Sequence, residues 1–587
     1  MKRPHAEEKV LAVQVNKMIK EKLEKTIKEI LERLSISPVE ISLEHPEEIS
    51  HGDYSSNVAL AYAKKFGMSP MDLAKRVTEK LKFENLPEIE KVEIAGPGFI
   101  NIFLSKKFFA ESVSEIGKAG KAFGRNGDLS GKKVILDYTD PNPFKEFHIG
   151  HLMSNAIGEA LSRIIEFRGA EVKRVCYQGD VGLHVAKTMW GILLNKKDFP
   201  KEKDSLSSRI KFLGSSYSLG SEKYENDEVA KKEIIELNKK IFDRTDKEIN
   251  KIYDLGKKWS LEHFAEIYKK LDTNFDYFIF ESETGPVGQK IVEEGFQKGI
   301  FEKSDGAIVY RGDKRGLHIR VFINSEGLPT YEAKDLGLAK IKYEKYPYDL
   351  SVVVTGNEIN DYFKVMLSAM GEMYPELSVK TKHVGHGMLR LPTGKMSSRT
   401  GKVITGESLL SKTEEMVLDK VKDRELSPGE KKEIAGEVSV GAIKYSILRQ
   451  SIGSDIIYDF DKSISFEGDS GPYLQYSYTR AKSILDKAKG EGVKSSVKVS
   501  AEEVGILEKY LYRFPEIVKR AGEEYEPHHI STYLMELSSA FNAYYANNKI
   551  VDKNDKFSSY KVALTEAFTV VMKNGLWLLG IKAPEKM

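Results

Sequence analysis

VILDYTDPNPFKEFHIGHLMSNAIGEALSRIIEFRGAEVKRVCYQ, residues 134–178, is the stretch that decides the fold. Val134, Leu136 and Tyr138 alternate with Ile135 and Asp137, which predicts a strand. Pro141 and Pro143 end that strand, because proline has no N–H to donate to a neighbouring strand. The stretch therefore opens with a strand that runs into a rigid loop.

A helix is predicted next, followed by a second strand. Gly169 ends the helix, since glycine tolerates the left-handed conformation at a helix C-terminus. Residues 171–177 then read as a strand, and a strand–helix–strand unit is expected to be parallel and right-handed. The helix prediction rests on apolar residues at helical spacing: Met153, Ile157, Leu161, Ile164 and Ile165.

His148, Ile149, Gly150 and His151 stand where this helix begins. A helix N-terminus has free N–H groups and partial positive charge, which suits a phosphate. Imidazole donors can hold a triphosphate without a fixed charge. Gly150 has no Cβ, so a flat base can lie against the backbone there. Taken alone, the pattern equally fits two capping or surface histidines.

A second motif, GKMSSRTGK at 394–402, lies far downstream. Two glycines bracket a loop rich in Lys, Ser and Arg, a composition that can close over phosphates. Together the two motifs resemble the HIGH and KMSKS signatures of class I aminoacyl-tRNA synthetases. The surrounding residues look like the arginyl-tRNA synthetase family, nearly from end to end: PNPFKEFHIGHL, HVGHGMLRLPTGKMSSRTGKVI, GPYLQYSYTRAKSIL and LLGIKAPEKM.

Composition fits a multidomain globular protein of 587 residues, with 41% hydrophobic and 30% charged residues. The net charge of +3 neither demands nor excludes a nucleic-acid partner. The single cysteine, Cys176, excludes an internal disulfide and a cysteine-based zinc site, and we expect no metal site. No apolar run is long enough to span a membrane, so a cytoplasmic protein is expected.

The resemblance implies an α/β multidomain fold: a Rossmann-type parallel-sheet catalytic core, an α+β N-terminal domain and an all-α anticodon-binding domain. A Lys/Glu-rich helical stretch at about 192–275 breaks the strand–helix alternation and is read as an insertion. The sheet is expected to resume with a hairpin at 307–312 and 319–324, and 350–356 as a buried parallel strand. The expected domains are 1–122 (tRNA-binding), 123–405 (catalytic), 406–468 (helical connecting) and 469–587 (anticodon-binding).

The reaction that the resemblance implies has two steps. The carboxylate of arginine attacks the α-phosphate of ATP, and the terminal ribose of tRNA(Arg) then takes the arginyl group. Mg²⁺ is expected to arrive with ATP, held by phosphates and waters. The ATP-binding residues implied by the family are His148, Gly150, His151, Met388 and Lys395.

The sequence departs from the class pattern at the second lysine of KMSKS, where Ser398 stands. In some members of the family a lysine before HIGH takes this role instead, and Lys145 occupies that place. The alternative is a solvated loop lysine. The hypothesis assigns catalysis to His148, His151, Lys145, Lys395, Ser397 and Arg399, with Lys402 assisting.

Arginine specificity needs carboxylates, because a guanidinium is a planar fork of donors that acids hold best. Tyr331 and Asp335 are four residues apart, so on a helix they share a face. On charge alone, lysine remains conceivable. Family matching selects Glu281, Tyr331 and Asp335 for the side chain, and Asn142, Asp137 and Glu358 for the amino and carboxylate ends.

Contacts with tRNA are expected at both ends of the chain, where unpaired bases stack on aromatic side chains. Phe99 and Asn101 match positions that meet the D-loop in the family. Tyr473, Tyr476, Tyr545 and Met587 match anticodon-loop contacts. For each aromatic, core packing is the competing interpretation.

Three other functions stay open. A second class I synthetase is one, but a cysteine enzyme would show zinc-site cysteines, and a glutamate enzyme would have a basic pocket. A small-molecule nucleotidyltransferase shares HxGH without needing the aromatic helical tail. A catalytically silent tRNA-binding paralogue is kept open by Ser398. The family leads us to expect a monomer.

Overall fold

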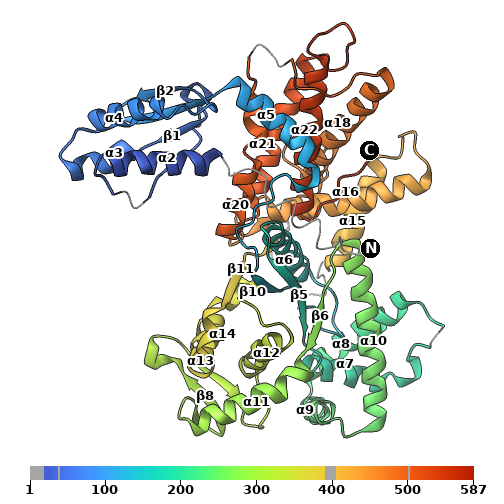
Figure 1. Cartoon of the computed structure of the whole chain (residues 1–587). Helices are drawn as coiled ribbons and strands as arrows, with labels where there is room; N and C mark the ends of the chain where they lie inside the picture. The colour runs from blue at the N-terminus through green and yellow to red at the C-terminus, as the bar shows by residue number, and fades with distance from the viewer. Residues whose placement is uncertain (1–18, 38–39, 202, 391–404, 500–502) are drawn as a thin grey trace.

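A computed structural model of the chain describes residues 19–37, 40–201, 203–390, 405–499 and 503–587. Figure 1 shows an N-terminal α/β domain reaching out from a bundle of C-terminal helices, with a central sheet below the bundle. Two further lobes lie beyond the sheet, one around α7–α10 and one around α11–α14. The central sheet is thus the part to which the other units connect.

The central sheet has five parallel strands in the order β11-β10-β4-β5-β6. The predicted parallel strand–helix–strand unit is confirmed by β4, α6 and β5. Strand order reverses between β4 and β10, and ligands bind at such switch points, beyond the carboxyl ends of the strands. The strands are β4 (Lys133–Asp137), β5 (Glu171–Gln178), β6 (Tyr277–Phe280), β10 (Leu350–Gly356) and β11 (Thr381–His386).

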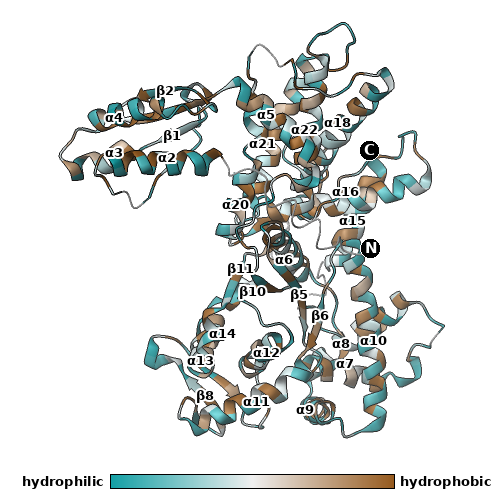
Figure 2. Ribbon diagram, in the orientation of Figure 1, coloured by the Kyte–Doolittle hydropathy of each residue, from teal (hydrophilic) through white to brown (hydrophobic). Residues whose placement is uncertain are grey.

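Helix α6 (Ile149–Phe167) is almost completely buried between this sheet and the C-terminal helices. A Cβ on Gly158 would lie 2.2 Å from the ring of Tyr138, so glycine is what allows the helix to come this close. One hydrophobic core unites β4, α6 and the C-terminal helices. Figure 2 shows hydrophobic residues concentrated along these central elements, with hydrophilic residues on the outer loops.

The stretch between β5 and β6 is helical, as predicted, and has a core of its own. That core includes Val185, Met189 and Ile192, so α7 belongs to this unit although it begins before residue 192. The helices are α7 (Leu183–Leu194), α8 (Leu206–Asn226), α9 (Glu228–Asp243) and α10 (Lys247–Lys270).

The predicted hairpin is present, but the expectation that it resumes the central sheet is wrong. Strands β8 and β9 pair antiparallel inside a separate three-stranded sheet, β7-β8-β9. Its aromatic residues Phe301, Tyr310 and Phe322 pack with α12 and α13. The elements are α11 (Glu281–Gln297), β7 (Glu302–Ser304), β8 (Ala307–Arg311), β9 (Ile319–Ile323), α12 (Tyr331–Lys345), α13 (Asn360–Met373) and α14 (Pro375–Val379).

The N-terminal domain carries an antiparallel sheet in the order β1-β3-β2 and rests on α20. Glu516 of α20 contacts both Tyr54 and His45, and Lys519 pairs with Glu21 at 2.8 Å. Its elements are α2 (Ile19–Arg33), β1 (Tyr54–Ser56), α3 (Val58–Tyr62), α4 (Pro70–Phe83), β2 (Ile89–Ala95) and β3 (Phe99–Leu104), with α5 (Lys106–Ala119) leading to the core.

The C-terminal part is helical, as predicted. Among the described helices, none combines the length and the apolar character needed to cross a membrane. The elements are β12 (Leu389–Arg390), α15 (Gly406–Lys420), α16 (Pro428–Leu448), β13 (Ile456–Ile457), α17 (Phe460–Ser463), α18 (Gly471–Glu491), α19 (Ile506–Leu511), α20 (Phe514–Glu524), α21 (His528–Asn547) and α22 (Ser558–Leu578). Short 3-10 turns occupy Ile49–His51, Ala63–Phe66, Gly120–Ala122, Lys196–Asp198, Gly312–Arg315 and Asn357–Ile359.

Candidate functional site

His148 and His151 form a reciprocal cap at the start of α6. Nδ1 of His148 accepts hydrogen bonds from the N–H groups of Gly150 at 3.1 Å and His151 at 3.4 Å. Nδ1 of His151 accepts one from the N–H of His148 at 3.2 Å, and the two rings stack 3.4 Å apart. Both Nδ1 atoms are acceptors, so each proton sits on Nε2, ready to donate to a ligand.

Both imidazoles are neutral near pH 7. Burial lowers the pKa of His148 to about 4, with the nearby charge of Lys145 adding to the effect, although part of the side chain reaches solvent. The pKa of His151 lies well below its usual value because of burial, with His148 and Lys145 contributing. The site thus offers uncharged donors at a helix N-terminus, as the sequence suggests.

Lys145 is half-buried, and its charge reaches both ends of the candidate site. It lowers the pKa of the two histidines and also contributes to lowering the pKa of the Glu281 carboxyl, which burial raises overall. Its Nζ lies 5.4 Å from the ring centroid of Tyr217 on α8, a cation–π distance. The charge of this lysine therefore acts on both the histidine pair and Glu281, while its ammonium contacts the helical insertion through Tyr217.

The predicted residues Lys395, Ser397 and Arg399, with the rest of 394–402, lie outside the described residues. Thr405, the first described residue after this segment, pairs with His148 in an isolated antiparallel bridge. Met388 follows β11 and is 42% exposed. Its main-chain N–H donates to Oδ1 of Asp455 at 2.8 Å.

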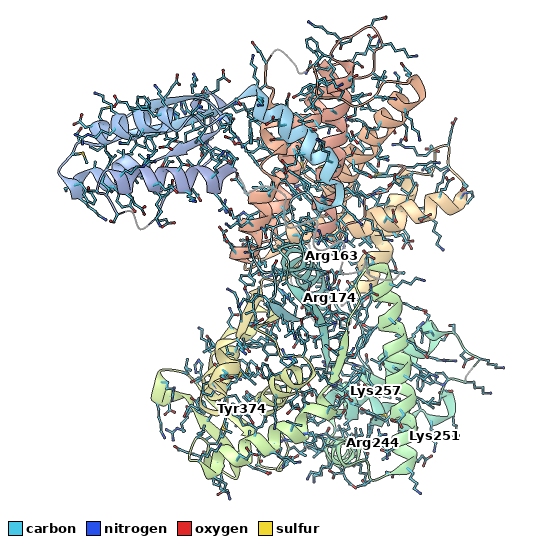
Figure 3. The ribbon with its side chains drawn as sticks, in the orientation of Figure 1. Arg163, Arg174, Arg244, Lys251, Lys257 and Tyr374 are labelled. Atoms are coloured by element: carbon cyan, nitrogen blue, oxygen red, sulfur yellow. The ribbon has the colours of Figure 1, made fainter. Side chains whose placement is uncertain are left out.

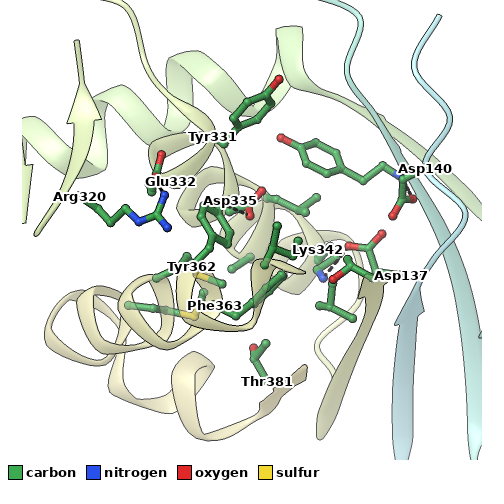
Figure 4. A pocket seen from close by; sticks show the side chains of 18 of the residues that line it. Asp137, Asp140, Arg320, Tyr331, Glu332, Asp335, Lys342, Tyr362, Phe363 and Thr381 are labelled. Carbon is green, nitrogen blue, oxygen red and sulfur yellow. Dashed lines mark hydrogen bonds and ion pairs between the residues drawn. The ribbon is translucent and has the colours of Figure 1, made fainter. Parts of the chain in front are cut away.

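A cavity of about 370 Å³ opens at the carboxyl ends of β4 and β10, against α12 and α13. Figure 4 shows its polar wall, where Asp335 stands close to Tyr362 and Tyr331 lies on the side toward Asp140. Such an acidic cavity suits a cationic ligand. Its polar lining comprises Asp137, Asp140, Tyr177, Arg320, Tyr331, Glu332, Asp335, Lys342, Thr355, Glu358, Tyr362 and Thr381.

Tyr331 and Asp335 occupy one face of α12, as their spacing predicts, and both line the cavity. The hydroxyl of Tyr362 donates to Oδ2 of Asp335 at 2.5 Å. Burial raises the pKa of Asp335 to about 7, against the stabilising effect of that hydrogen bond. The carboxyl is therefore close to half-ionised at neutral pH and gains most from an arriving cation.

Glu281 and Asn142 meet at Gly179, just past β5. The N–H of Gly179 donates to Oδ1 of Asn142 at 2.9 Å. A Cβ at Gly179 would lie 2.6 Å from that oxygen and 2.9 Å from Oε1 of Glu281, so the position needs glycine. The charges of Glu281 and Asp335 both raise the pKa of Tyr177 and of Tyr331, after burial. Tyr177 and Tyr331 line the cavity together with Asp335, whereas Glu281 and Asn142 are not among its lining residues.

Two other predicted residues line the cavity itself. Asp137 is 1% exposed and forms a buried ion pair with Lys342 at 3.1 Å, although it lines the cavity. Burial raises its pKa while Lys342 opposes the shift. Glu358 is exposed on the cavity rim, in the turn after β10.

Asp180 is the anchor that sequence reasoning missed. It is fully buried and accepts from the N–H of Ser282 at 2.9 Å and its hydroxyl at 2.6 Å. It also accepts from Tyr253 at 2.9 Å and Lys257 at 2.7 Å, both on α10. The start of α11, where Glu281 sits, is thereby tied to the insertion. The run QGD after the strand was the available signal, since strand ends of parallel sheets gather ligands.

The candidate tRNA-contacting residues of the N-terminal domain differ in exposure. Phe99 is 40% exposed at the start of β3, so it is not part of the small sheet's core. Asn101 is 5% exposed, and its Oδ1 accepts a hydrogen bond from Ser55 at 2.8 Å. Of the pair, Phe99 has the surface available for stacking.

The C-terminal tyrosines share one surface, joined by Arg480. The Arg480 guanidinium lies 4.7 Å from the ring centroid of Tyr476 and 5.5 Å from that of Tyr545. Asn542 donates to the hydroxyl of Tyr473 at 2.9 Å and also contacts Arg480. Met587 packs in the same small cluster as Phe466, whose ring adjoins Tyr476. The four predicted positions are thus linked by partners that the sequence did not reveal.

Metal-binding groups are not evident near these sites. Across 19–37, 40–201, 203–390, 405–499 and 503–587, no cluster of three or more His, Cys, Asp or Glu is arranged to hold a metal ion. The imidazole N–H groups of α6 suit phosphate oxygens rather than a cation.

Comparison with protein families matches most of the chain. Residues 118–460 match "tRNA synthetases class I (R), catalytic domain", and residues 474–587 match "DALR anticodon binding domain". Residues 17–104 match "Arginyl tRNA synthetase N terminal domain".

Curated relatives of similar length carry one name, arginine–tRNA ligase. The protein of Halothermothrix orenii is 31% identical over 573 residues, covering 97% of this chain and 99% of its own. That of Fusobacterium nucleatum is 32% identical over 579 residues, covering 96% and 98%. Among solved structures, Thermus thermophilus arginyl-tRNA synthetase has the same fold, with a TM-score of 0.78, 23% identity, and 97% and 100% of the two chains covered.

Proposed function

The chain belongs to the arginyl-tRNA synthetases of class I, and we propose that it activates L-arginine with ATP and transfers the arginyl group to tRNA(Arg). One observation supports this most directly. A pair of neutral histidine donors and an acidic cavity lie at the same edge of one parallel sheet. A triphosphate and a cationic amino acid can therefore meet there.

In the first step, a carboxylate oxygen of arginine attacks the α-phosphorus of ATP, and pyrophosphate leaves as the arginyl-adenylate forms. In the second, the terminal ribose hydroxyl of tRNA attacks the carbonyl carbon, and AMP leaves. No covalent enzyme intermediate is needed. Positioning of the two substrates and stabilisation of the transferring phosphate supply the rate enhancement.

The phosphates are held by the Nε2–H groups of His148 and His151, at the N-terminus of α6. Gly150 and Met388 border the adenine. Lys145 neutralises charge on the leaving pyrophosphate, in place of the missing KMSKS lysine. Lys395, Ser397 and Arg399 complete this arrangement from the segment outside the described residues. Mg²⁺ accompanies ATP and is held by its phosphates and by water.

The guanidinium lies between Glu281 and Asp335, with the Tyr331 hydroxyl as a further partner. In support, Tyr177 and Tyr331 line the cavity with Asp335, and the charges of both acids add to the burial that raises the pKa of the two phenols. Asn142 lies at the amino end of the substrate, through its contact with Gly179. Asp137, which is paired with Lys342, and Glu358 on the cavity rim are proposed for the amino and carboxylate ends.

tRNA contacts are proposed for Phe99 and Asn101 at the D-loop, and for Tyr473, Tyr476, Tyr545 and Met587 at the anticodon loop. The exposed rings of Phe99 and Tyr545 support stacking on unpaired bases. We further propose that the enzyme is a cytoplasmic monomer.

The test is amino-acid-dependent exchange of pyrophosphate into ATP, with and without tRNA(Arg). Arginine, lysine and glutamate are compared at equal concentrations. Exchange with arginine alone is expected. Exchange that requires tRNA would further indicate that tRNA completes the active site. Tight tRNA binding without exchange for any amino acid would contradict the proposal and favour a silent tRNA-binding protein.

A further inference from the structure

Next to Tyr331, which lines the cavity, Glu281 already has an ammonium partner within the protein. Nζ of Lys334 lies 2.5 Å from Oε2 of Glu281, and the two side chains are 9% and 6% exposed. Lys334 precedes Asp335 on α12, and its Nζ is 5.1 Å from the ring centroid of Tyr331. One oxygen of Glu281 is therefore occupied by a lysine of the protein before any substrate arrives.

We propose that Lys334 is a specificity-determining residue that excludes lysine from the amino acid cavity. The inference rests on the proposed activation of arginine and concerns the cationic amino acid that most resembles it. Lysine and arginine share a long aliphatic stem and a positive charge, so net charge alone does not separate them.

Lys334 changes which hydrogen-bond acceptors remain for a substrate. Oε2 of Glu281 is taken by Lys334, while Oε1 lies on the side of Gly179. Oδ2 of Asp335 accepts from Tyr362 at 2.5 Å. Each acid is thus left with about one oxygen free. Two single acceptors on separate acids suit a planar fork with five donors, which can reach both.

A substrate ammonium fits this arrangement poorly. It is a compact, strongly hydrated charge that needs several acceptors around one atom when it is desolvated. Near Glu281 it would also meet the ammonium of Lys334, whose charge already lowers the pKa of the Glu281 carboxyl that burial raises. Like-charge repulsion in a buried site opposes lysine more than the delocalised guanidinium.

Removing the ammonium of Lys334 reverses these conditions. Lys334→Met keeps an unbranched side chain of similar length and frees Oε2 of Glu281. It also leaves a buried carboxylate without its partner, which a substrate ammonium can compensate. We expect the ratio of kcat/KM for arginine to that for lysine to fall roughly tenfold or more, because the repulsive element is lost.

The experiment measures pyrophosphate exchange with arginine and with lysine at saturating tRNA(Arg), for wild type and three variants. Lys334→Met is expected to gain lysine activation. Lys334→Arg, which keeps the charge and the donors to Glu281, is expected to retain wild-type discrimination. Lys345→Met, an exposed lysine on the same helix, controls for loss of charge from α12.

The outcomes separate the two proposals. Wild-type enzyme without arginine-dependent exchange overturns the proposed function itself. Wild-type exchange with an unchanged arginine-to-lysine ratio in Lys334→Met overturns the role of Lys334 alone. If Lys334→Met does not fold, Lys334→Gln replaces it, because the amide can still donate to Glu281 while carrying no charge. An unchanged ratio there is equally decisive against the inference.

Discussion

Arg163 donates a hydrogen bond from Nη1 to the main-chain carbonyl of Trp577 at 3.0 Å, across 414 residues of sequence. The same guanidinium pairs with Glu159 at 2.7 Å and with Asp272 at 3.0 Å. Figure 3 shows Arg163 and Arg174 where the C-terminal helices meet the central sheet. Arg163 thus joins helix α6, which begins at the histidine pair, to the C-terminal helix α22.

Lys444 completes this junction and predicts a pH effect on stability. It is fully buried and donates to the carbonyls of Leu271 at 2.6 Å and Gly580 at 2.9 Å. Burial lowers its pKa to about 7, with Arg163 adding to the effect. The unfolded state therefore holds the proton more tightly, and stability rises with pH between about 7 and the usual lysine pKa.

In Lys444→Met, the rise of unfolding free energy with pH that is due to this amine is expected to disappear. The difference in unfolding free energy between wild type and variant should change by up to about 1.4 kcal/mol per pH unit. Urea denaturation at pH 7.5, 8.5 and 9.5 measures it. Lys345→Met, on an exposed surface, should leave the slope unchanged. Parallel slopes for wild type and Lys444→Met would show that the buried amine does not titrate there.

Two substitutions of His148 can distinguish its structural role as a helix cap from a catalytic role. His148→Asn keeps a good N-cap but cannot reach a phosphate with a ring N–H. We expect both His148→Asn and His148→Ala to reduce pyrophosphate exchange by roughly 10²–10³-fold, the usual cost of a lost transition-state donor. Only the alanine variant should also lose about 1 kcal/mol of stability. Normal pyrophosphate exchange in His148→Asn would show that His148 serves only as a helix cap.

Asp335 predicts how arginine affinity depends on pH. Its pKa of about 7 in the free protein means that the carboxyl is largely protonated at pH 6. Because the ionised form holds the guanidinium, KM for arginine should rise as pH falls from 8 to 6, by up to about tenfold per unit below the pKa. KM for ATP should stay nearly flat, since the pKa of His148 is about 4. Asp335→Asn should have a high KM for arginine without this dependence, and equal pH effects on both KM values would count against it.

Lys145 is tested by removing its charge. We expect Lys145→Ala to lower the rate of arginine activation by roughly 10²–10³-fold, with unchanged tRNA affinity, because the charge on the leaving pyrophosphate is no longer neutralised. Lys145→Arg should retain much of the rate. Tyr217→Phe keeps the ring below the ammonium and serves as the matched control. A wild-type rate of pyrophosphate exchange in Lys145→Ala would show that Lys145 is a loop residue without a catalytic role.

Tyr545 is expected to contribute to tRNA binding rather than to folding. It is 42% exposed, so Tyr545→Ala should leave stability nearly unchanged. Its loss should weaken tRNA(Arg) binding by about 1–3 kcal/mol if one base stacks on the ring. Tyr545→Phe keeps the stacking face and should bind normally. Phe83→Ala, at an 86% exposed aromatic in the N-terminal domain, controls for a general loss of surface. Equal tRNA(Arg) binding by Tyr545→Ala and wild type would show that Tyr545 does not contact the tRNA.

Features that depend on neighbouring residues in the sequence were predicted correctly. The strand–helix–strand unit at 134–178 follows from apolar spacing and from proline and glycine positions, and it is confirmed. The shared face of Tyr331 and Asp335 follows from helical periodicity in the same way. The separate sheet β7-β8-β9 was missed, because a hairpin pattern specifies pairing within the hairpin and not the sheet that it joins.

Partners that are distant in sequence had no such signal. Lys334 and Glu281 are 53 residues apart, and each alone reads as an ordinary surface charge. Arg480 lies between Tyr476 and Tyr545 because α18 and α21 pack together, which no periodicity encodes. The family resemblance proposed several ligand-facing residues, whereas the residues that hold them in place came from the three-dimensional structure.

The junction at Arg163 and Lys444 also sets an order of events during synthesis. Ribosomes deliver the N-terminal part of a chain first, at roughly 5–20 residues per second. The carbonyls of Trp577 and Gly580 therefore emerge long after α6 and the central sheet have been made. Until then Arg163 and Lys444 each lack one of their buried acceptors, so the nascent nucleotide-binding unit is incomplete and exposed to chaperones. A nascent chain stalled before residue 577 should therefore be more protease-sensitive around α6 than one released after residue 580.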